Sequence, residues 1–174
     1  MNEYIFKSRV WLITDDNGNL IPDVDTDQIF HNAHLYITDI NEMWKYTFGN
    51  LEGWKDFPKK AENGDIIIAG KNFGSGSSRQ QAVDCFKALG IKLIIAESFG
   101  AIYKRNAINS GFPIMISQNI NDIMSQKKIL NLQNISVDIL KGELINLDTE
   151  EKINLTPFSK VQKDIYDKGI LLNM

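Results

Sequence analysis

Three short apolar runs, at residues 66–69, 93–96 and 114–116, are the feature that most constrains the fold of this chain. Continuous apolar runs of this length are typical of strands buried on both faces of a sheet. Between them, the segments 78–89 and 99–110 repeat apolar residues at helical spacing. Strands that alternate with helices predict a parallel sheet with right-handed crossovers.

The two ends of the chain predict additions to this parallel core. Residues 4–13 read as an opening strand, and residues 135–147 alternate apolar and polar positions around a turn, as an antiparallel hairpin does. Thr156 and Pro157 have the pattern of an N-cap and a first helical position, which predicts a final helix. We therefore expect one α/β domain over residues 1–174, with three layers and a mixed sheet.

The segment between the first strand and the parallel core is less regular. Residues 22–38 show no periodicity, and residues 39–48 predict a short helix capped by Thr38 or Asp39. Residues 49–64 contain three glycines and a proline, which predicts a mobile connection.

Composition excludes several classes of protein. The 174 residues are 43% hydrophobic, enough for the core of one domain, and a net charge of -3 argues against nucleic-acid binding. No run of 18 apolar residues and no secretory signal occurs, so we expect a cytoplasmic protein with no membrane span. Cys85 is the only cysteine, so this chain cannot form an internal disulfide or hold an iron–sulfur cluster by itself.

The glycine-rich stretch from Gly70 to Arg79 joins the run at 66–69 to the following helix. Glycines let the backbone approach a ligand closely, and Arg79 can bind a carboxylate or phosphate with two hydrogen bonds. A helix N-terminus here would favour an anion and could activate a serine. The alternative is a loop that only caps the helix, with Ser77 or Ser78 as N-cap. Neither a Walker loop nor a dinucleotide fingerprint fits these residues.

Two other sets of polar residues are open to more than one interpretation. Asp25 and Asp27 flank Thr26, and such carboxylates can serve in acid–base chemistry, bind a cation or cap a turn. His31 and His34 are the only histidines, and without a third ligand their spacing is a weak metal signal.

Taken together, these motifs resemble the swivel domain of the aconitase superfamily. The matching stretches, which spread over roughly residues 3–168, are 25–29 (DTDQI), 64–69 (GDIIIA), 72–79 (NFGSGSSR) and 96–113 (AESFGAIYKRNAINSGFP). As a free-standing chain of this length, it is similar to the small subunits of the 3-isopropylmalate dehydratase family. The resemblance implies a swivelling β/β/α fold. It also implies a hydro-lyase that interconverts 2- and 3-isopropylmalate in leucine biosynthesis by removing and re-adding water.

The resemblance also implies roles for individual residues. Ser77 would be the base that takes a proton next to a substrate carboxylate, and Arg79 would stabilise that carboxylate. The remaining substrate-binding residues would be Thr26, Asp27, His34, Leu35, Tyr36, Ile37, Gly76 and Ser78. The substrate would be a small hydroxy-dicarboxylate. No metal would be bound by this chain, and a partner large subunit would carry a [4Fe–4S] cluster.

The segment from His34 to Ile37 would help to select the substrate side chain. No Lys or Arg occurs between Arg9 and Lys45 to pair with an extra carboxylate, so an apolar branch is expected. Three alternatives remain open: a homoaconitase small subunit, a small subunit for another substituted malate, and a stand-alone module that binds a small anion.

Overall fold

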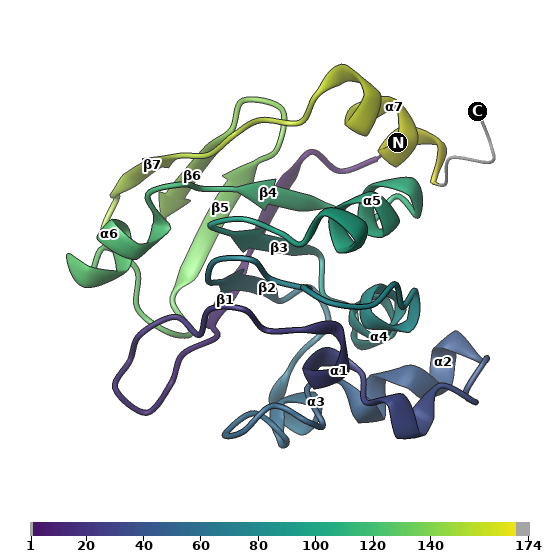
Figure 1. The fold of residues 1–174 in the computed structure, drawn as a ribbon. Helices are drawn as coiled ribbons and strands as arrows, with labels where there is room; N and C mark the ends of the chain where they lie inside the picture. The colour runs from purple at the N-terminus through teal and green to yellow at the C-terminus, as the bar shows by residue number, and fades with distance from the viewer. Residues whose placement is uncertain (1, 170–174) are drawn as a thin grey trace.

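A computed structural model describes residues 2–169 and contains a seven-stranded mixed sheet (Figure 1). The strand order is β4-β3-β2-β1-β5-β6-β7, in which β1 to β4 run parallel and β5 to β7 are joined by antiparallel pairings. The strands are β1 (Ile5–Leu12), β2 (Ile66–Ala69), β3 (Leu93–Ala96), β4 (Ile114–Ile116), β5 (Asn134–Asp138), β6 (Glu143–Asn146) and β7 (Lys152–Asn154).

Short helices lie in the connections between these strands and after β7. They are α1 (Thr26–Ile29), α2 (Ile40–Met43), α3 (Phe57–Lys60), α4 (Gln81–Leu89), α5 (Ala101–Asn109), α6 (Ile120–Ser125) and α7 (Lys160–Lys168), with 3-10 turns at Asn32–His34 and Trp44–Tyr46. The helix α2 begins after Asp39, whose side chain accepts a hydrogen bond from the backbone N–H of Asn41, so the predicted cap is confirmed.

Two separate hydrophobic clusters cover the two faces of the parallel strands. Ile67 and Ile94 point into one cluster together with residues of α4 and α5. Ile66 and Ile95 point into the other, which also contains Val137 and further residues of the antiparallel strands. The antiparallel half therefore folds over one face of the parallel half, and helices cover the other face (Figure 1). This confirms the predicted β/β/α layering with a mixed sheet.

The final helix begins later than its sequence pattern indicated. Thr156 donates its backbone N–H to the carbonyl of Ile116, and Gln162 donates its side-chain amide to the carbonyl of Ile114. These bonds cover the outer edge of β4, which would otherwise present unpaired carbonyls. The helix α7 then starts after Ser159, whose hydroxyl accepts from the N–H of Gln162. Neither α6 nor β7 was predicted.

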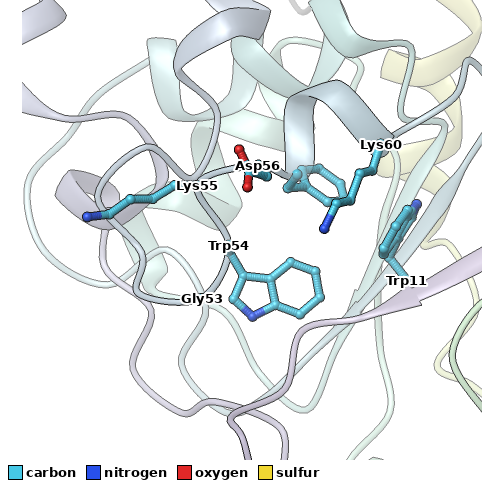
Figure 2. A pocket seen from close by; sticks show the side chains of 7 residues that line it. Trp11, Gly53, Trp54, Lys55, Asp56 and Lys60 are labelled. Atoms are coloured by element: carbon cyan, nitrogen blue, oxygen red, sulfur yellow. The ribbon is translucent and has the colours of Figure 1, made fainter.

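The connection at residues 49–64 is anchored to the core. Leu51 and Phe57 are buried, and the indole N–H of Trp54 donates to the carbonyl of Thr14 at 2.9 Å. We expected a mobile connection from its three glycines and its proline. The buried aromatic and aliphatic side chains hold it against the core instead, where Trp54 packs edge-on against Trp11 of β1 (Figure 2).

Candidate functional site

The glycine-rich loop after β2 is held between two other segments of the chain. The backbone N–H of Gly74 donates to Val24, the N–H of Thr26 donates to Ser75, and the N–H of Gly100 donates to Phe73. Gly74 has φ +77°, and a Cβ there would lie 2.2 Å from Cγ of the Tyr103 ring. Because no side chain fits at this position, the residue must be glycine for the three segments to meet.

Ser77 lies on the exposed part of this loop, between Gly76 at φ +92° and Ser78. Its carbonyl accepts a 2.9 Å hydrogen bond from the hydroxyl of Thr26, and Thr26 is only 3% exposed. Within residues 2–169, the Ser77 hydroxyl has no hydrogen-bond partner, so it is available to a ligand. Thr26 therefore holds the loop in place with the hydroxyl that was expected to contact a substrate.

Arg79 forms an ion pair with Asp27, 52 residues away in the sequence. Its Nη1 donates to Oδ1 of Asp27 at 2.8 Å and to the carbonyl of Phe30 at 3.1 Å. The guanidinium side chain is 14% exposed. The described part of the chain offers no partner to Nε or Nη2 of Arg79, so two donors are left for a second carboxylate.

Asp27, which pairs with Arg79, is itself held by two further hydrogen bonds. Its Oδ1 also accepts from the backbone N–H of Asn32, and its Oδ2 accepts from the side-chain amide of Asn50. The hydrogen bond from Arg79 lowers the pKa of this carboxyl below its ordinary value, and the Asn32 N–H and nearby His31 act in the same direction. Asp27 is therefore ionised at neutral pH and fixes the guanidinium by charge and by geometry. Its role in the geometry is to orient Arg79.

The helix α4 starts at Gln81, three residues later than predicted, and no side chain caps it. The Ser77 carbonyl accepts from Thr26, and the bonds at the start of the helix use the carbonyls of Arg79 and Gln80. Ser78 instead accepts a 3.2 Å hydrogen bond from the side-chain amide of Asn106. The prediction of a serine N-cap is wrong. Because dipole effects fade within the first turn, a helix that starts at Gln81 adds little positive potential at Ser77.

The segment from His34 to Ile37 divides into anchored and exposed residues. The ring of His34 stacks on the ring of Tyr46, with 4.0 Å between their centroids. Ile37 packs against the hydrophobic cluster that contains Ile67 and residues of α4 and α5. Leu35 is exposed, and Tyr36 is 75% exposed. Two of the four predicted residues are thus presented on the surface, and the other two hold the segment in place.

Two asparagines at this site were not predicted as site residues. Asn50, which contacts Asp27, lies in the connection at 49–64, where no motif marks it. Asn106, which contacts Ser78, lies inside the stretch at 96–113 that matched the superfamily, so a signal for it was present.

Cys85 does not belong to the exposed site. It lies in α4, fully buried, and burial raises the pKa of its thiol to about 12. A buried, protonated thiol cannot serve as a ligand to a cluster held by another chain. Among residues 2–169 no three His, Cys, Asp or Glu side chains come together as a metal site, and no helix is long and apolar enough to cross a membrane.

Comparison with known proteins identifies the family. Residues 25–119 match the aconitase C-terminal domain. The 3-isopropylmalate dehydratase small subunit of Aquifex aeolicus is 40% identical over 96% of this chain and 92% of its own length. The methanogen homoaconitase small subunit of Methanothermobacter thermautotrophicus is 35% identical over 98% of this chain and 91% of its own. The crystal structure of the 3-isopropylmalate dehydratase LeuD of Methanocaldococcus jannaschii superposes with a TM-score of 0.82 at 34% identity, covering 97% of this chain and 92% of that one. The chain therefore belongs to the aconitase C-terminal domain family, and relatives that match it over nearly their whole length include dehydratase and homoaconitase small subunits.

Proposed function

We propose that this chain is the small subunit of a cytoplasmic 3-isopropylmalate dehydratase, which interconverts 2- and 3-isopropylmalate in leucine biosynthesis. The observation that carries the proposal is the end-to-end similarity to dehydratase small subunits. The exposed loop fits this assignment, because Gly76, Ser77 and Ser78 face solvent and can form one wall of a site completed by a large subunit.

In this proposal Ser77 is the base and Arg79 holds the substrate carboxylate. The free Nε and Nη2 of Arg79 can bind that carboxylate in a bidentate manner, and their charge stabilises the negative charge that grows as the α-proton leaves. A [4Fe–4S] cluster in the large subunit would supply the Lewis acid for the leaving hydroxyl.

The substrate side chain is proposed to contact Leu35 and Tyr36, which are the exposed residues of their segment. A tricarboxylate such as homoaconitate would bring a further negative charge to this place and would need a cation there. The nearest arginine and lysine in the sequence are Arg9 and Lys45, so the segment itself provides none. An alkyl branch is therefore the better fit. A hydrophobic pocket distinguishes two alkyl groups that differ by one methylene by only about 1–3 kcal/mol of binding free energy.

The test is reconstitution of this chain with a 3-isopropylmalate dehydratase large subunit, followed by kinetic assays of isopropylmalate, citramalate and homoaconitate. We expect the highest kcat/KM for the alkylmalates and a shift toward homoaconitate in Tyr36→Arg. A preference for homoaconitate in the unmodified complex would show that the substrate assignment is wrong.

The same complex tests the assignment of the base. Ser77→Ala should lower kcat by at least about 10²-fold while the complex still assembles. Ser78→Ala is the matched control and should lower kcat much less. If the two variants exchange these outcomes, the base is Ser78.

A further inference from the structure

Asn106 of α5 contacts the Ser77 loop from the side opposite to its own helix axis, through a side-chain hydrogen bond. Its Nδ2 donates to the hydroxyl oxygen of Ser78 at 3.2 Å, across 28 residues of sequence. Asn106 is partly buried, and Ser78 is exposed. The contact therefore joins an amide at the edge of the folded core to a hydroxyl that faces the proposed site.

The helix α5 holds this amide at a fixed place. Tyr103, which precedes Asn106 by three residues, is 1% exposed, and its hydroxyl donates to the carbonyl of Ala82 in α4 at 3.1 Å. The same ring occupies the space that a Cβ of Gly74 would need. Residues three apart are neighbours on a helix surface, so Asn106 lies beside the ring that joins α5 to both α4 and the glycine loop. In Figure 1 the two helices lie on the same face of the sheet.

The direction of the hydrogen bond decides what the hydroxyl of Ser78 can do. A serine hydroxyl has one proton to donate and two lone pairs that accept. The amide of Asn106 occupies one lone pair, and no group within residues 2–169 accepts the proton. The Ser78 hydroxyl is therefore left as a hydrogen-bond donor on the exposed part of the loop.

The two neighbours of Ser78 are held in the same manner. Thr26 contacts Ser77 through its carbonyl, and Asp27 contacts Arg79 through Nη1. In each residue of the triplet, the group that is held differs from the group that stays free. The free groups of Ser78 and Arg79 are all donors, which suits a ligand that carries carboxylates.

We infer that Asn106 is a positioning residue, which holds the Ser78 hydroxyl so that its proton is donated to a carboxylate of the substrate. This inference rests on the proposed dehydratase function, in which Arg79 binds a substrate carboxylate. Without Asn106 the hydroxyl turns freely, and its hydrogen bond to the substrate becomes weaker. Because other residues hold Ser77 and Arg79, loss of Asn106 weakens substrate binding and leaves proton transfer intact.

The experiment is a double-mutant cycle on the complex of this chain with a 3-isopropylmalate dehydratase large subunit. Asn106→Ala should raise KM for isopropylmalate about three- to tenfold, the loss expected for one hydrogen bond, and should keep kcat within about twofold. Ser78→Ala should raise KM at least as much. The double variant should have the KM of Ser78→Ala, because Asn106 acts only through that hydroxyl.

The matched control is Asn109→Ala, which removes another asparagine of α5 and should leave KM and kcat unchanged. Three results overturn the inference. They are an unchanged KM in Asn106→Ala, a double variant in which the two effects on KM multiply, and an equal rise of KM in Asn109→Ala.

The contact is also checked without activity, by NMR of the full chain. The side-chain amide signals of Asn106 should shift in Ser78→Ala, and unchanged signals would show that the contact is absent. An unmodified complex that does not convert isopropylmalate refutes the proposed function and this inference with it. An active complex that gives any of the three contrary results refutes the inference alone.

Discussion

Two substitutions of Asp27 distinguish the effect of its charge from the effect of its shape. Three of its partners donate hydrogen bonds, Arg79 and Asn32 to Oδ1 and Asn50 to Oδ2, and Nε2 of His31 lies 4.0 Å from Oδ2. In Asp27→Asn the amide oxygen can keep Arg79 and Asn32, while the new NH₂ group faces Asn50, whose own amide can turn to accept. Asp27→Asn thus removes the charge and keeps the geometry, and Asp27→Ala removes both.

The expected costs follow from the exposure of the two partners. A hydrogen bond to a charged group contributes about 1.5–3 kcal/mol when buried, but exposed ion pairs contribute about 0–1 kcal/mol. Asp27 is one-third exposed and Arg79 is 14% exposed, so the pair lies between these limits. We expect the free energy of unfolding to fall by about 1 kcal/mol in Asp27→Asn and by about 2 kcal/mol in Asp27→Ala.

Activity should separate the two variants more sharply than stability does. With Arg79 still held, Asp27→Asn should keep kcat/KM of the complex within about tenfold of the unmodified protein. In Asp27→Ala the Arg79 side chain is released, so kcat/KM of the complex should fall about 10²-fold, as expected when a positioning group is displaced by about 1 Å. If Asp27→Ala retained full kcat/KM, orientation of Arg79 by Asp27 would be excluded.

The pH dependence gives an independent check by urea unfolding. The hydrogen bond from Arg79 lowers the pKa of Asp27 in the folded chain, so the pair stabilises the fold above the ordinary carboxyl pKa of about 4. This stabilisation is lost as the pH falls through the lowered value. The difference between Asp27→Asn and the unmodified chain should therefore be present at pH 7 and shrink below about pH 4. An equal difference at both pH values would contradict the electrostatic account.

Three further predictions concern stability and reactivity. Gly74→Ala should cost at least about 3 kcal/mol in urea unfolding, because its Cβ would lie 2.2 Å from a buried ring carbon, whereas Gly76→Ala has room and should cost about 1 kcal/mol. Asp65→Asn should lower the free energy of unfolding by about 3 kcal/mol, because this carboxylate is 1% exposed and accepts four hydrogen bonds. The control Asp56→Asn, at an exposed residue, should lower it by less than about 0.5 kcal/mol. Cys85 should react with a thiol reagent only on unfolding, since its pKa is raised to about 12, and rapid labelling of the native chain would contradict its burial.

The regular elements of the parallel core were predictable because their signals are local. The runs at 66–69 and 93–96 are strands at those residues, and Gly90 ends α4 in the left-handed conformation, as its position after an apolar segment predicts. The hairpin at 135–147 follows from alternation, which is also a property of neighbouring residues.

The starts of α4 and α7 were not predictable, because contacts with distant residues set the path of the backbone before each helix. The carbonyl of Ser77 accepts from Thr26, and the N–H of Thr156 donates to Ile116 of β4. A cap pattern contains no information about such contacts, whose partners lie 51 and 40 residues away.

The amino-acid sequence by itself determined the alternation of strands and helices, the glycine loop and the motifs of the aconitase C-terminal domain family. Only the tertiary structure decided that the antiparallel strands fold over the parallel ones, that Asp27 orients Arg79, and that Thr26 positions Ser77. The physical reason is the same in each case. Hydrophobic periodicity depends on residues a few positions apart, whereas a hydrogen bond between residues more than 50 positions apart depends on how every intervening element packs.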